Sequence, residues 1–312
     1  MKHFILPLLC SLAMIVTNCR AASETQNENH QNLESELTVA LESLDGQAGL
    51  FVEHFDSGFE YAYNADTVFT SASLVKVPIM IGIYDRLESG EYEFREEFKF
   101  KEEYKPESFV HLTGNLKPET EVPLSELLML MMSFSDNTAS LWLQELAGGG
   151  EGINELMEKL GTDHTRVNSR TEGREDSFDE FGWGQTTPRE MTQLMEQIYK
   201  RDLFSHQASE SMYRVLSRTY YQGEALSQIP AEINVASKQG AVSHSRSETV
   251  IVNAPSGSYA FTLLTQNQND TSWDFNNEGY KLIRQVSHIL WEYFGDDTDY
   301  TPPDDDMLKK WY

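Results

Sequence analysis

A serine and a lysine stand three residues apart in Ser73-Leu74-Val75-Lys76, at the start of a mostly apolar run. If this segment is helical, the two side chains lie on one face a turn apart, with the hydroxyl beside the amine. Burial by the apolar neighbours would lower the lysine pKa, and the neutral amine could then accept the serine proton to make a nucleophile. The alternative is an ordinary helix start, with Ser73 as a cap and Lys76 in solvent.

Two more polar segments occur later in the chain. Ser135-Asp136-Asn137 separates two apolar helical segments, so its polar groups must be hydrogen-bonded or face a cavity. Lys238 and Gly240 come at the end of an alternating run that predicts a strand. Taken singly, the first segment is better explained as a capped turn and the second as a solvated strand end.

The three segments together, in this order, resemble the motifs S-x-x-K, S-D-N and K-T-G of the serine β-lactamase and penicillin-binding protein superfamily. The chain is most similar to class A β-lactamases. Gly114-Asn115-Leu116 and Thr186-Thr187-Pro188, each before a predicted helix, also look like that family. The likeness extends over about residues 35–295, nearly the whole mature chain.

The resemblance implies a role for each polar residue in catalysis. Ser73 would attack an acyl carbon, with Lys76 as its proton acceptor. Ser135 would pass a proton to the departing nitrogen. The backbone N–H groups of Ser73 and Ala241 would form the oxyanion hole, where losing one donor typically costs about 3 to 4 kcal/mol of transition-state stabilisation.

The resemblance also implies the groups that bind substrate. Asn137 would hydrogen-bond both Lys76 and the substrate amide, and Lys238 would supply positive charge near a substrate carboxylate. Arg246 is a candidate second partner for that carboxylate through its bidentate fork, although a solvated loop arginine is an equal alternative. The predicted substrate-binding residues are therefore Asn137, Lys238, Gln239, Gly240, Ala241 and Arg246.

Two departures from the class A pattern bear on the substrate. Gln239 replaces the usual threonine, so an amide stands where a hydroxyl is expected. Class A enzymes also carry a glutamate followed by leucine and asparagine, which hold the water that releases the acyl-enzyme. Residues 166–186 lack this leucine and asparagine. Glu172 is the best candidate for the deacylating base and Glu175 the second; without a held water, acylation would survive and turnover would slow.

Three functions follow from these observations. The first is β-lactam hydrolysis through an acyl-enzyme on Ser73. The second is a D,D-peptidase or penicillin-binding acyl-transfer enzyme acting on peptidoglycan peptides with slow deacylation. The third is a non-catalytic envelope protein that binds a partner on the same fold.

Strand and helix signals predict a mixed α/β (α+β) chain. The resemblance implies a three-layer sandwich, in which an antiparallel sheet is flanked by terminal helices and carries an all-helical insertion over about residues 70–225. Periodicity predicts helices at 33–44, 73–88, 124–132, 141–146 and 278–293, a hairpin at 49–63, a long connection at 91–123, and strands at 233–241, 248–252 and 259–265.

Composition and charge restrict the partners. The 312 residues are 39% hydrophobic, which is typical of a soluble globular protein. Subtracting 50 acidic from 24 basic residues gives a charge of −26. Nucleic acids bind basic surfaces, so none is expected. The eight histidines form no ligand-spaced cluster, so we expect no metal. We also expect no cofactor, a monomeric protein and a small-molecule substrate.

The first residues are predicted to be an export signal. Apolar residues 4–16 are too few for a membrane-spanning helix. Both cysteines, Cys10 and Cys19, fall in this segment or at its end, so no disulfide is expected in the mature domain. Cys19 lies in a sequence that resembles a lipobox and could carry a lipid anchor; cleavage after Ala21 or Ala22 is the alternative. Both imply export, to the periplasm or as a membrane-anchored lipoprotein.

These signals divide the chain into four segments. They are a signal peptide at 1–21, a polar linker at 22–32, a catalytic domain at 33–295 and an acidic, mobile tail at 296–312.

Overall fold

Five antiparallel strands form the central sheet of the computed structural model, which describes residues 28–107, 111–295 and 300–310. The strands lie in the order β2-β1-β10-β9-β8, so that β8 is an edge strand. Their bounds are Gln47–His54 (β1), Phe59–Tyr63 (β2), Val235–Val242 (β8), Ser245–Ala254 (β9) and Gly257–Gln266 (β10). The predicted hairpin at 49–63 and all three late strands are confirmed.

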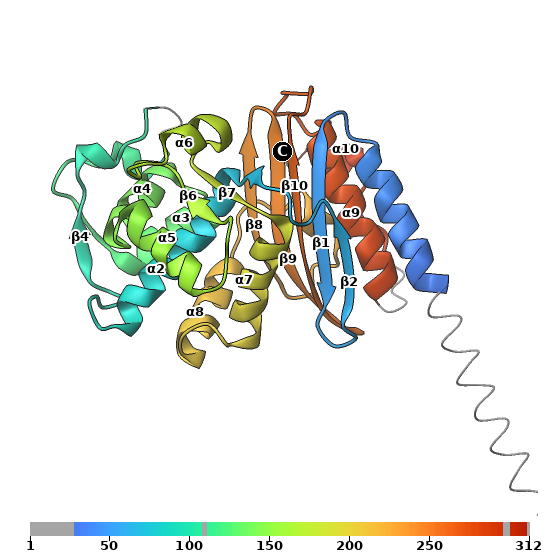
Figure 1. Ribbon diagram of the computed structural model, residues 1–312, viewed down its shortest axis with the longest axis horizontal. Helices are drawn as coiled ribbons and strands as arrows, with labels where there is room; N and C mark the ends of the chain where they lie inside the picture. The colour runs from blue at the N-terminus through green and yellow to red at the C-terminus, as the bar shows by residue number, and fades with distance from the viewer. Residues whose placement is uncertain (1–27, 108–110, 296–299, 311–312) are drawn as a thin grey trace, which may run out of the picture.

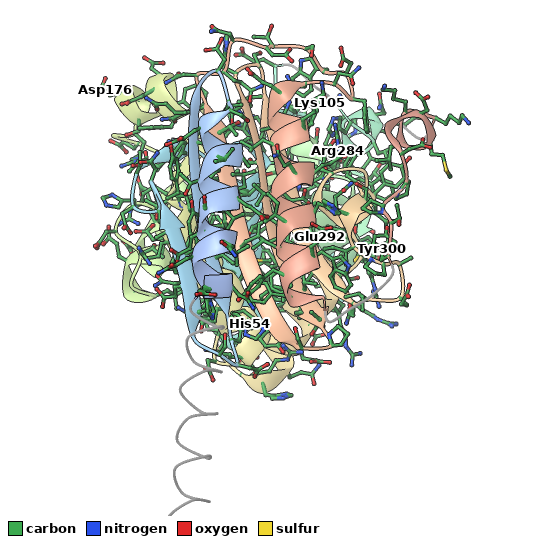
Figure 2. All side chains as sticks on the ribbon, turned by 90° about the vertical axis from the view of Figure 1, so that its right-hand side faces the viewer. His54, Lys105, Asp176, Arg284, Glu292 and Tyr300 are labelled. Carbon is green, nitrogen blue, oxygen red and sulfur yellow. The ribbon has the colours of Figure 1, made fainter. Side chains whose placement is uncertain are left out.

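Two helices from opposite ends of the chain lie side by side on one face of this sheet (Figures 1 and 2). The first covers residues 28–42 and the second is α9, Glu278–Phe294. Leu33, Leu37 and Leu41 recur every four residues and are buried, which gives the first helix an apolar stripe that faces the sheet. Residues 28–32, predicted as linker, are helical, and the His30 ring stacks on Phe59 of β2 at 4.7 Å.

A helical half covers the other face, between β3 and β8 in the chain (Figure 1). Its helices are α2 (Lys76–Glu88), α3 (Leu124–Ser133), α4 (Asn137–Leu146), α5 (Gly149–Lys159), α6 (Glu175–Phe181), α7 (Pro188–Lys200) and α8 (His206–Leu216). Short strands β3 (Phe69–Thr70), β6 (Arg166–Val167) and β7 (Gly184–Thr186) form a second sheet. The predicted α+β class, with a helical insertion between the strands, is confirmed.

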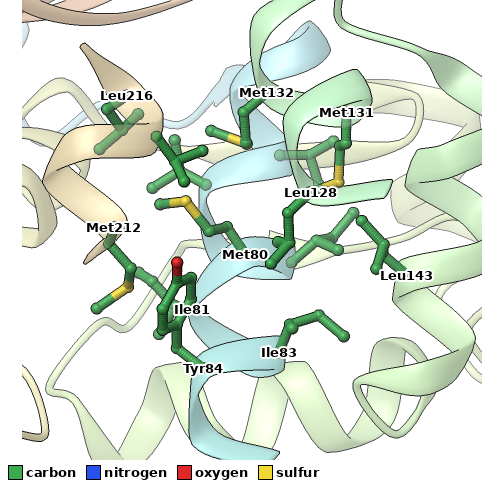
Figure 3. Close-up of a cluster of buried hydrophobic side chains, with 14 of the residues drawn as sticks. Met80, Ile81, Ile83, Tyr84, Leu128, Met131, Met132, Leu143, Met212 and Leu216 are labelled. Carbon is green, nitrogen blue, oxygen red and sulfur yellow. The ribbon is translucent and has the colours of Figure 1, made fainter. Parts of the chain in front are cut away.

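Helix α2 passes through the middle of the helical half. Every residue from Lys76 to Tyr84 is buried, and the apolar ones pack against side chains of α3, α4 and α8 (Figure 3). Apolar residues on all sides of a helix indicate a core position. The core therefore fixes the start of α2, where Lys76 lies.

The connection at 91–123 contains more structure than the sequence indicated. Strands β4 (Glu97–Lys99) and β5 (Glu121–Pro123) pair with each other, and two 3-10 turns, η2 (Glu102–Tyr104) and η3 (Thr113–Asn115), lie between them. Strands this short contain too few residues to show an alternating pattern.

Residues 300–310, which fall in the predicted mobile acidic tail, contain a helix and pack against the domain. Helix α10, Asp305–Leu308, ends this segment, and Leu308 is buried. The Tyr300 hydroxyl donates to the Ser227 carbonyl at 3.2 Å, and the Lys309 amine lies 5.7 Å from the centre of the Phe275 ring. The apolar surface of Tyr300 and Leu308 outweighs the charge of the neighbouring aspartates.

No helix within the described ranges is long and apolar enough to cross a membrane.

A buried ion pair joins α9 to the segment before the sheet's edge strand. One terminal nitrogen of Arg284 donates to Glu224 Oε2 at 2.7 Å, and the other to the Phe275 carbonyl at 2.7 Å. The Arg284 guanidinium also lies 3.8 Å from the centre of the Phe275 ring. Side-chain exposures of 7% and 2% for Arg284 and Glu224 leave neither charge to water.

We expect Arg284→Ala to lower the free energy of unfolding by about 3 to 5 kcal/mol, because it leaves the Glu224 charge buried without its ion-pair partner. Arg214→Ala is the matched control; its pair with Glu210 lies in solvent, so its loss should lower the free energy of unfolding far less. Urea denaturation of both variants measures the difference. Equal, small losses would show that the buried pair does not support the fold.

Candidate active site

Ser73 lies in the 3-10 turn η1, Ala72–Val75, which leads directly into α2. Ser71, not Ser73, occupies the N-cap position of this turn, so the Ser73 hydroxyl is not used as a cap. Ala72 has a φ of +45°, a left-handed conformation that is costly for a residue with a Cβ. The surrounding structure therefore holds the turn at Ser73 in a strained conformation, as is common next to catalytic groups.

The Lys76 amine contacts the serine and both ends of the S-D-N motif. Its Nζ lies 2.8 Å from Ser73 Oγ, 2.8 Å from the Ser135 carbonyl, 2.9 Å from Ser135 Oγ and 2.8 Å from Asn137 Oδ1. The carbonyl and the amide oxygen can only accept hydrogen bonds. A neutral amine has two N–H donors for them, which leaves its lone pair to accept the proton of a serine hydroxyl.

The surroundings of Lys76 favour this neutral form. Complete burial is the main cause that holds the pKa of the Lys76 amine well below its usual value. The positive charge of Lys238 lowers that pKa further, and Asp136 opposes the shift. Burial removes the water that would solvate the ammonium, so the base is unprotonated nearer to neutral pH. The structure thus supports the proton-transfer interpretation of S-x-x-K over a solvent-exposed lysine.

Ser135 lies between two lysines. Its Oγ is 2.9 Å from Lys76 Nζ and 3.1 Å from Lys238 Nζ. Its φ of +56° places it in the left-handed region. A hydroxyl that touches the base on one side and a second amine on the other can pass a proton from Lys76 towards a departing group.

Asp136 holds the turn that presents Ser135 and Asn137. Its carboxylate, with no exposure to solvent, caps α4 by accepting from the Ala139 N–H at 2.8 Å. It also accepts from the Thr113 N–H at 3.0 Å and from the Thr113 hydroxyl at 2.5 Å. The sequence analysis gave Asp136 no role of its own, although an aspartate just before a helix is a strong cap signal.

Strand β8 passes directly beside the nucleophile. A Cβ on Gly240 would lie 2.8 Å from the Ser73 amide nitrogen and 3.0 Å from the Ser71 carbonyl oxygen, closer than packed atoms allow. Only a glycine permits this approach. It brings the main chain of Gly240 and Ala241 next to the Ser73 N–H, where two N–H groups are needed for the predicted oxyanion hole.

Lys238 reaches the site from the opposite side of β8 to Gln239. Its Nζ donates to Ser135 Oγ and, at 2.6 Å, to the Gln239 carbonyl. Burial lowers the pKa of the Lys238 amine to about 7, against the opposing charge of Glu248. Lys238 therefore belongs to the same cluster as Ser73, Lys76 and Ser135, as predicted from motif order.

Glu248 is a buried acid behind β8 that the sequence analysis did not single out. Its carboxylate accepts from Ser237 Oγ at 2.6 Å and from the Ala225 N–H at 3.0 Å. Burial raises the pKa of Glu248 to about 7, and these hydrogen bonds partly oppose the rise. The sequence feature that could have identified Glu248 is an acidic residue at the start of an otherwise apolar strand.

Two predicted substrate-binding side chains are directed away from the cluster. Gln239 pairs with Glu248 across β8 and β9, so its side chain lies on the face covered by α9. Arg246 is fully buried, and its terminal nitrogens donate to the carbonyls of Val242, Ser245 and Ser272. The Arg246 guanidinium lies 4.7 Å from the ring centres of both Trp273 and Tyr280. This arrangement does not support the predicted contact with a substrate carboxylate.

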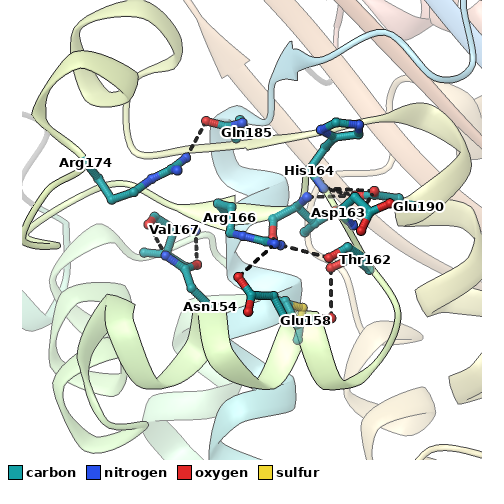
Figure 4. Close-up of polar contacts among 12 residues, drawn as sticks. Asn154, Glu158, Thr162, Asp163, His164, Arg166, Val167, Arg174, Gln185 and Glu190 are labelled. Atoms are coloured by element: carbon teal, nitrogen blue, oxygen red, sulfur yellow. Dashed lines mark hydrogen bonds and ion pairs between the residues drawn. The ribbon is translucent and has the colours of Figure 1, made fainter.

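The loop that carries Glu172 is tied down at both ends. Figure 4 shows Asn154 bonded to both main-chain groups of Val167, at 2.7 and 2.9 Å, and Arg174 bonded to Gln185 at 2.7 Å. Further along, the Phe181 carbonyl accepts from Thr70 Oγ1 at 2.6 Å. These bonds attach the loop to α5, to β7 and, through Thr70, to the strand that precedes Ser73.

The two candidate deacylating bases lie at the surface of this loop. Glu172 and Glu175 are both exposed and line a surface hollow of about 440 Å³, whose lining includes none of the residues around Ser73. The Glu172 carboxylate makes no hydrogen bond or ion pair with any residue in the described part of the chain. Its role as a base remains a prediction.

Metal-binding side chains do not gather anywhere in the described ranges: no three His, Cys, Asp or Glu residues there could hold an ion together.

A family model described as "Beta-lactamase enzyme family" matches residues 32–294. The chain belongs to the beta-lactamase enzyme family. The predicted resemblance to β-lactamase-like serine hydrolases is thereby confirmed. Among curated relatives of this family, "Beta-lactamase VEB-1" from Pseudomonas aeruginosa is 18% identical over 278 residues, which cover 86% of this chain and 92% of the relative. A beta-lactamase from Rhodobacter capsulatus is 24% identical over 262 residues, covering 80% and 86%.

Solved structures of similar proteins share the fold. The TLA-1 extended-spectrum beta-lactamase superposes with a TM-score of 0.77 at 19% identity, over 86% of this chain and all of the other. PBP-A superposes with a TM-score of 0.74 at 24% identity, over 84% and 96% of the two chains.

We expect Gly240→Ala to lower the rate of acylation by about 10²- to 10³-fold, because the added methyl would push β8 away from the Ser73 amide and open the oxyanion hole. Gly152→Ala is the control, since the nearest atom to its new Cβ is 3.5 Å away. Stopped-flow acylation rates, with a thermal melt to confirm folding, measure the effect. A folded Gly240→Ala protein with normal rates would place the oxyanion hole elsewhere.

Proposed function

We propose that this protein hydrolyses β-lactams through an acyl-enzyme on Ser73. The observation that carries the proposal is the contact between a fully buried lysine amine and two serine hydroxyls. Family membership supports the same chemistry.

Acylation would proceed as follows. Lys76 Nζ takes the proton of the Ser73 hydroxyl, and Ser73 Oγ bonds to the lactam carbonyl carbon. The ring C–N bond breaks, and the proton moves from Lys76 through Ser135 Oγ to the ring nitrogen. The main-chain N–H groups beside Gly240 stabilise the oxyanion. Lys238 holds Ser135 in place and adds positive charge to a site in a strongly acidic protein.

Deacylation would release the acid product. Water attacks the ester carbon, gives up a proton to a base, and Ser73 leaves with its proton restored. Glu172 is the proposed base, although its carboxylate is exposed in the structure. Because the Glu172 carboxylate has no hydrogen-bond partner in the described ranges to orient it, we expect this step to limit turnover.

We further propose that the chain is exported and acts outside the cytoplasm, where it would protect its host against β-lactams. Residues 1–27, which lie outside the described residues, support this through their sequence alone. The intact mass of the mature chain distinguishes a lipid-modified Cys19 from cleavage after Ala21 or Ala22.

With penicillin G, the purified protein should form a covalent adduct within the mixing time and regenerate free enzyme as product appears. Ser73→Ala should form no adduct and lose activity by a factor on the order of 10⁴ to 10⁶. Intact-mass analysis with a chase follows both steps. An adduct that never clears would instead identify an acyl-transfer enzyme of the penicillin-binding type, and an adduct in Ser73→Ala would refute the nucleophile.

Glu172→Gln should slow deacylation by about 10²-fold and leave acylation unchanged, because a neutral amide cannot take a proton from water. Glu175→Gln, on the same loop and equally exposed, should change neither step by more than about twofold. Decay of the acyl-enzyme mass in both variants separates the two carboxylates. If the acyl-enzyme decays at the same rate in both variants, neither carboxylate of this loop can be assigned as the base.

A further inference from the structure

Three aromatic side chains with large exposed surfaces lie next to Ser135. Phe134 immediately precedes it and is 39% exposed, while Tyr220 and Tyr221, in the segment after α8, are 64% and 40% exposed. We call these three residues the aromatic patch. Water-exposed rings gathered together usually mark a surface that binds something.

The aromatic patch is built as a unit. The Phe134 and Tyr220 rings stack with centres 4.9 Å apart and planes 28° apart, and Tyr221 meets Tyr220 edge-on at 5.3 Å. The Tyr220 N–H donates to the Ser133 carbonyl at 3.2 Å, and the Tyr221 hydroxyl donates to the Phe134 carbonyl at 3.4 Å. These two bonds attach the segment after α8 to the end of α3. The rings are thus held in place while their outer surfaces stay in water.

The aromatic patch lies next to Ser135, on the leaving-nitrogen side of the substrate. Ser135 is the group that hands a proton to the leaving nitrogen, so substituents on the nitrogen side of the scissile amide must lie beside it. Phe134 is covalently adjacent to Ser135, and Tyr220 covers Phe134. An apolar substituent there would meet ring faces rather than solvent.

The charged side chains that could bind an anion on the leaving-nitrogen side of the substrate already have other partners. The terminal nitrogens of Arg246 are bonded to three carbonyls, and Glu248 lies behind β8 as an opposing charge to Lys238. The patch itself carries no charged side chain. Recognition on this side therefore relies more on apolar contact and less on pairing with an anion.

We propose that the aromatic patch is a substrate subsite that binds an aromatic or large apolar substituent on the leaving-nitrogen side of the scissile amide. This inference rests on the proposed function for the orientation of substrate. The ligand class is a cephalosporin-like lactam with an aryl or styryl group on the ring that contains the nitrogen. Tyr220 and Tyr221 are specificity-determining residues in this proposal, not catalytic ones.

The test compares two cephalosporins that share one acylamino side chain and differ at C3, one with a dinitrostyryl group and one with a methyl group. Binding is measured by calorimetry in Ser73→Ala protein, which cannot react, with and without Tyr220→Ala. We expect Tyr220→Ala to weaken binding of the dinitrostyryl compound by about 3- to 10-fold, as for loss of an aromatic contact. Binding of the methyl compound should change by less than about twofold.

A control variant separates the subsite from general effects. Phe94→Ala removes a ring that is 42% exposed beside the opposite end of α3, where the Phe94 carbonyl accepts from the Ser125 N–H, and should change neither affinity. Equal losses for both compounds in Tyr220→Ala, or no loss for either, would overturn the subsite.

The same ratio in reactive protein distinguishes this inference from the proposed function. Tyr220→Ala in the presence of Ser73 should lower kcat/KM for the dinitrostyryl compound relative to the methyl compound by the same factor. If the reactive protein hydrolyses neither compound while the binding difference persists, the proposed function fails and the subsite stands. If both compounds are hydrolysed with an unchanged ratio, the subsite fails and the proposed function stands.

Discussion

The active site depends on the exclusion of water from one amine. Lys76 can accept a proton from Ser73 only while it is neutral, and complete burial is the main cause of its low pKa. That burial requires α2 to run through the core of the helical half, the S-D-N turn to close over the amine, and β8 to approach within contact of η1. The packing that buries Lys76 is therefore the same packing that allows its amine to act as a base.

Burial of charge continues behind the site. Lys238 on β8 and Glu248 on β9 lie on opposite faces of the sheet, and Glu248 is bonded to Ser237 of β8 and to the Ala225 N–H. Residue 225 follows Glu224, which pairs with Arg284 of α9. Two buried acids and two buried bases therefore balance each other across β8, β9 and α9. This network fixes the α9-facing side of β8, the strand that carries Lys238. The interactions that stabilise the sheet therefore also position Lys238.

The loop from Asn168 to Gln185 has a different character. Bonds from Asn154 to Val167, from Arg174 to Gln185 and from Thr70 to Phe181 fix this loop in place. The carboxylates of Glu172 and Glu175 on its outer turn face water. The amines of Lys76 and Lys238 beside Ser73 are thus buried, whereas the carboxylates of this loop lie in solvent.

Much of the fold and of the acylation centre follows from local sequence. The alternating runs at 233–241 and 259–265 predict strands, and the four-residue spacing of Leu33, Leu37 and Leu41 predicts a helix. The three motifs resemble those of the family in type and order, and that resemblance implied that Ser73, Lys76, Ser135, Asn137 and Lys238 meet. Short strands such as β4 and β5, and the packed segment around Leu308, carry too few residues for such a pattern.

Tertiary structure alone decided where side chains on the strands point and what they meet. Arg246 and Gln239 have the residue types for substrate binding, but the pairing of β8 with β9 directs both side chains to the α9 face, where aromatic rings and main-chain carbonyls receive Arg246. Phe134, Tyr220 and Tyr221 become neighbours only because α8 packs against α3. The sequence determines which groups are available, whereas the partners of a buried or stacked group come from segments far away along the chain, and only the folded chain brings them within contact.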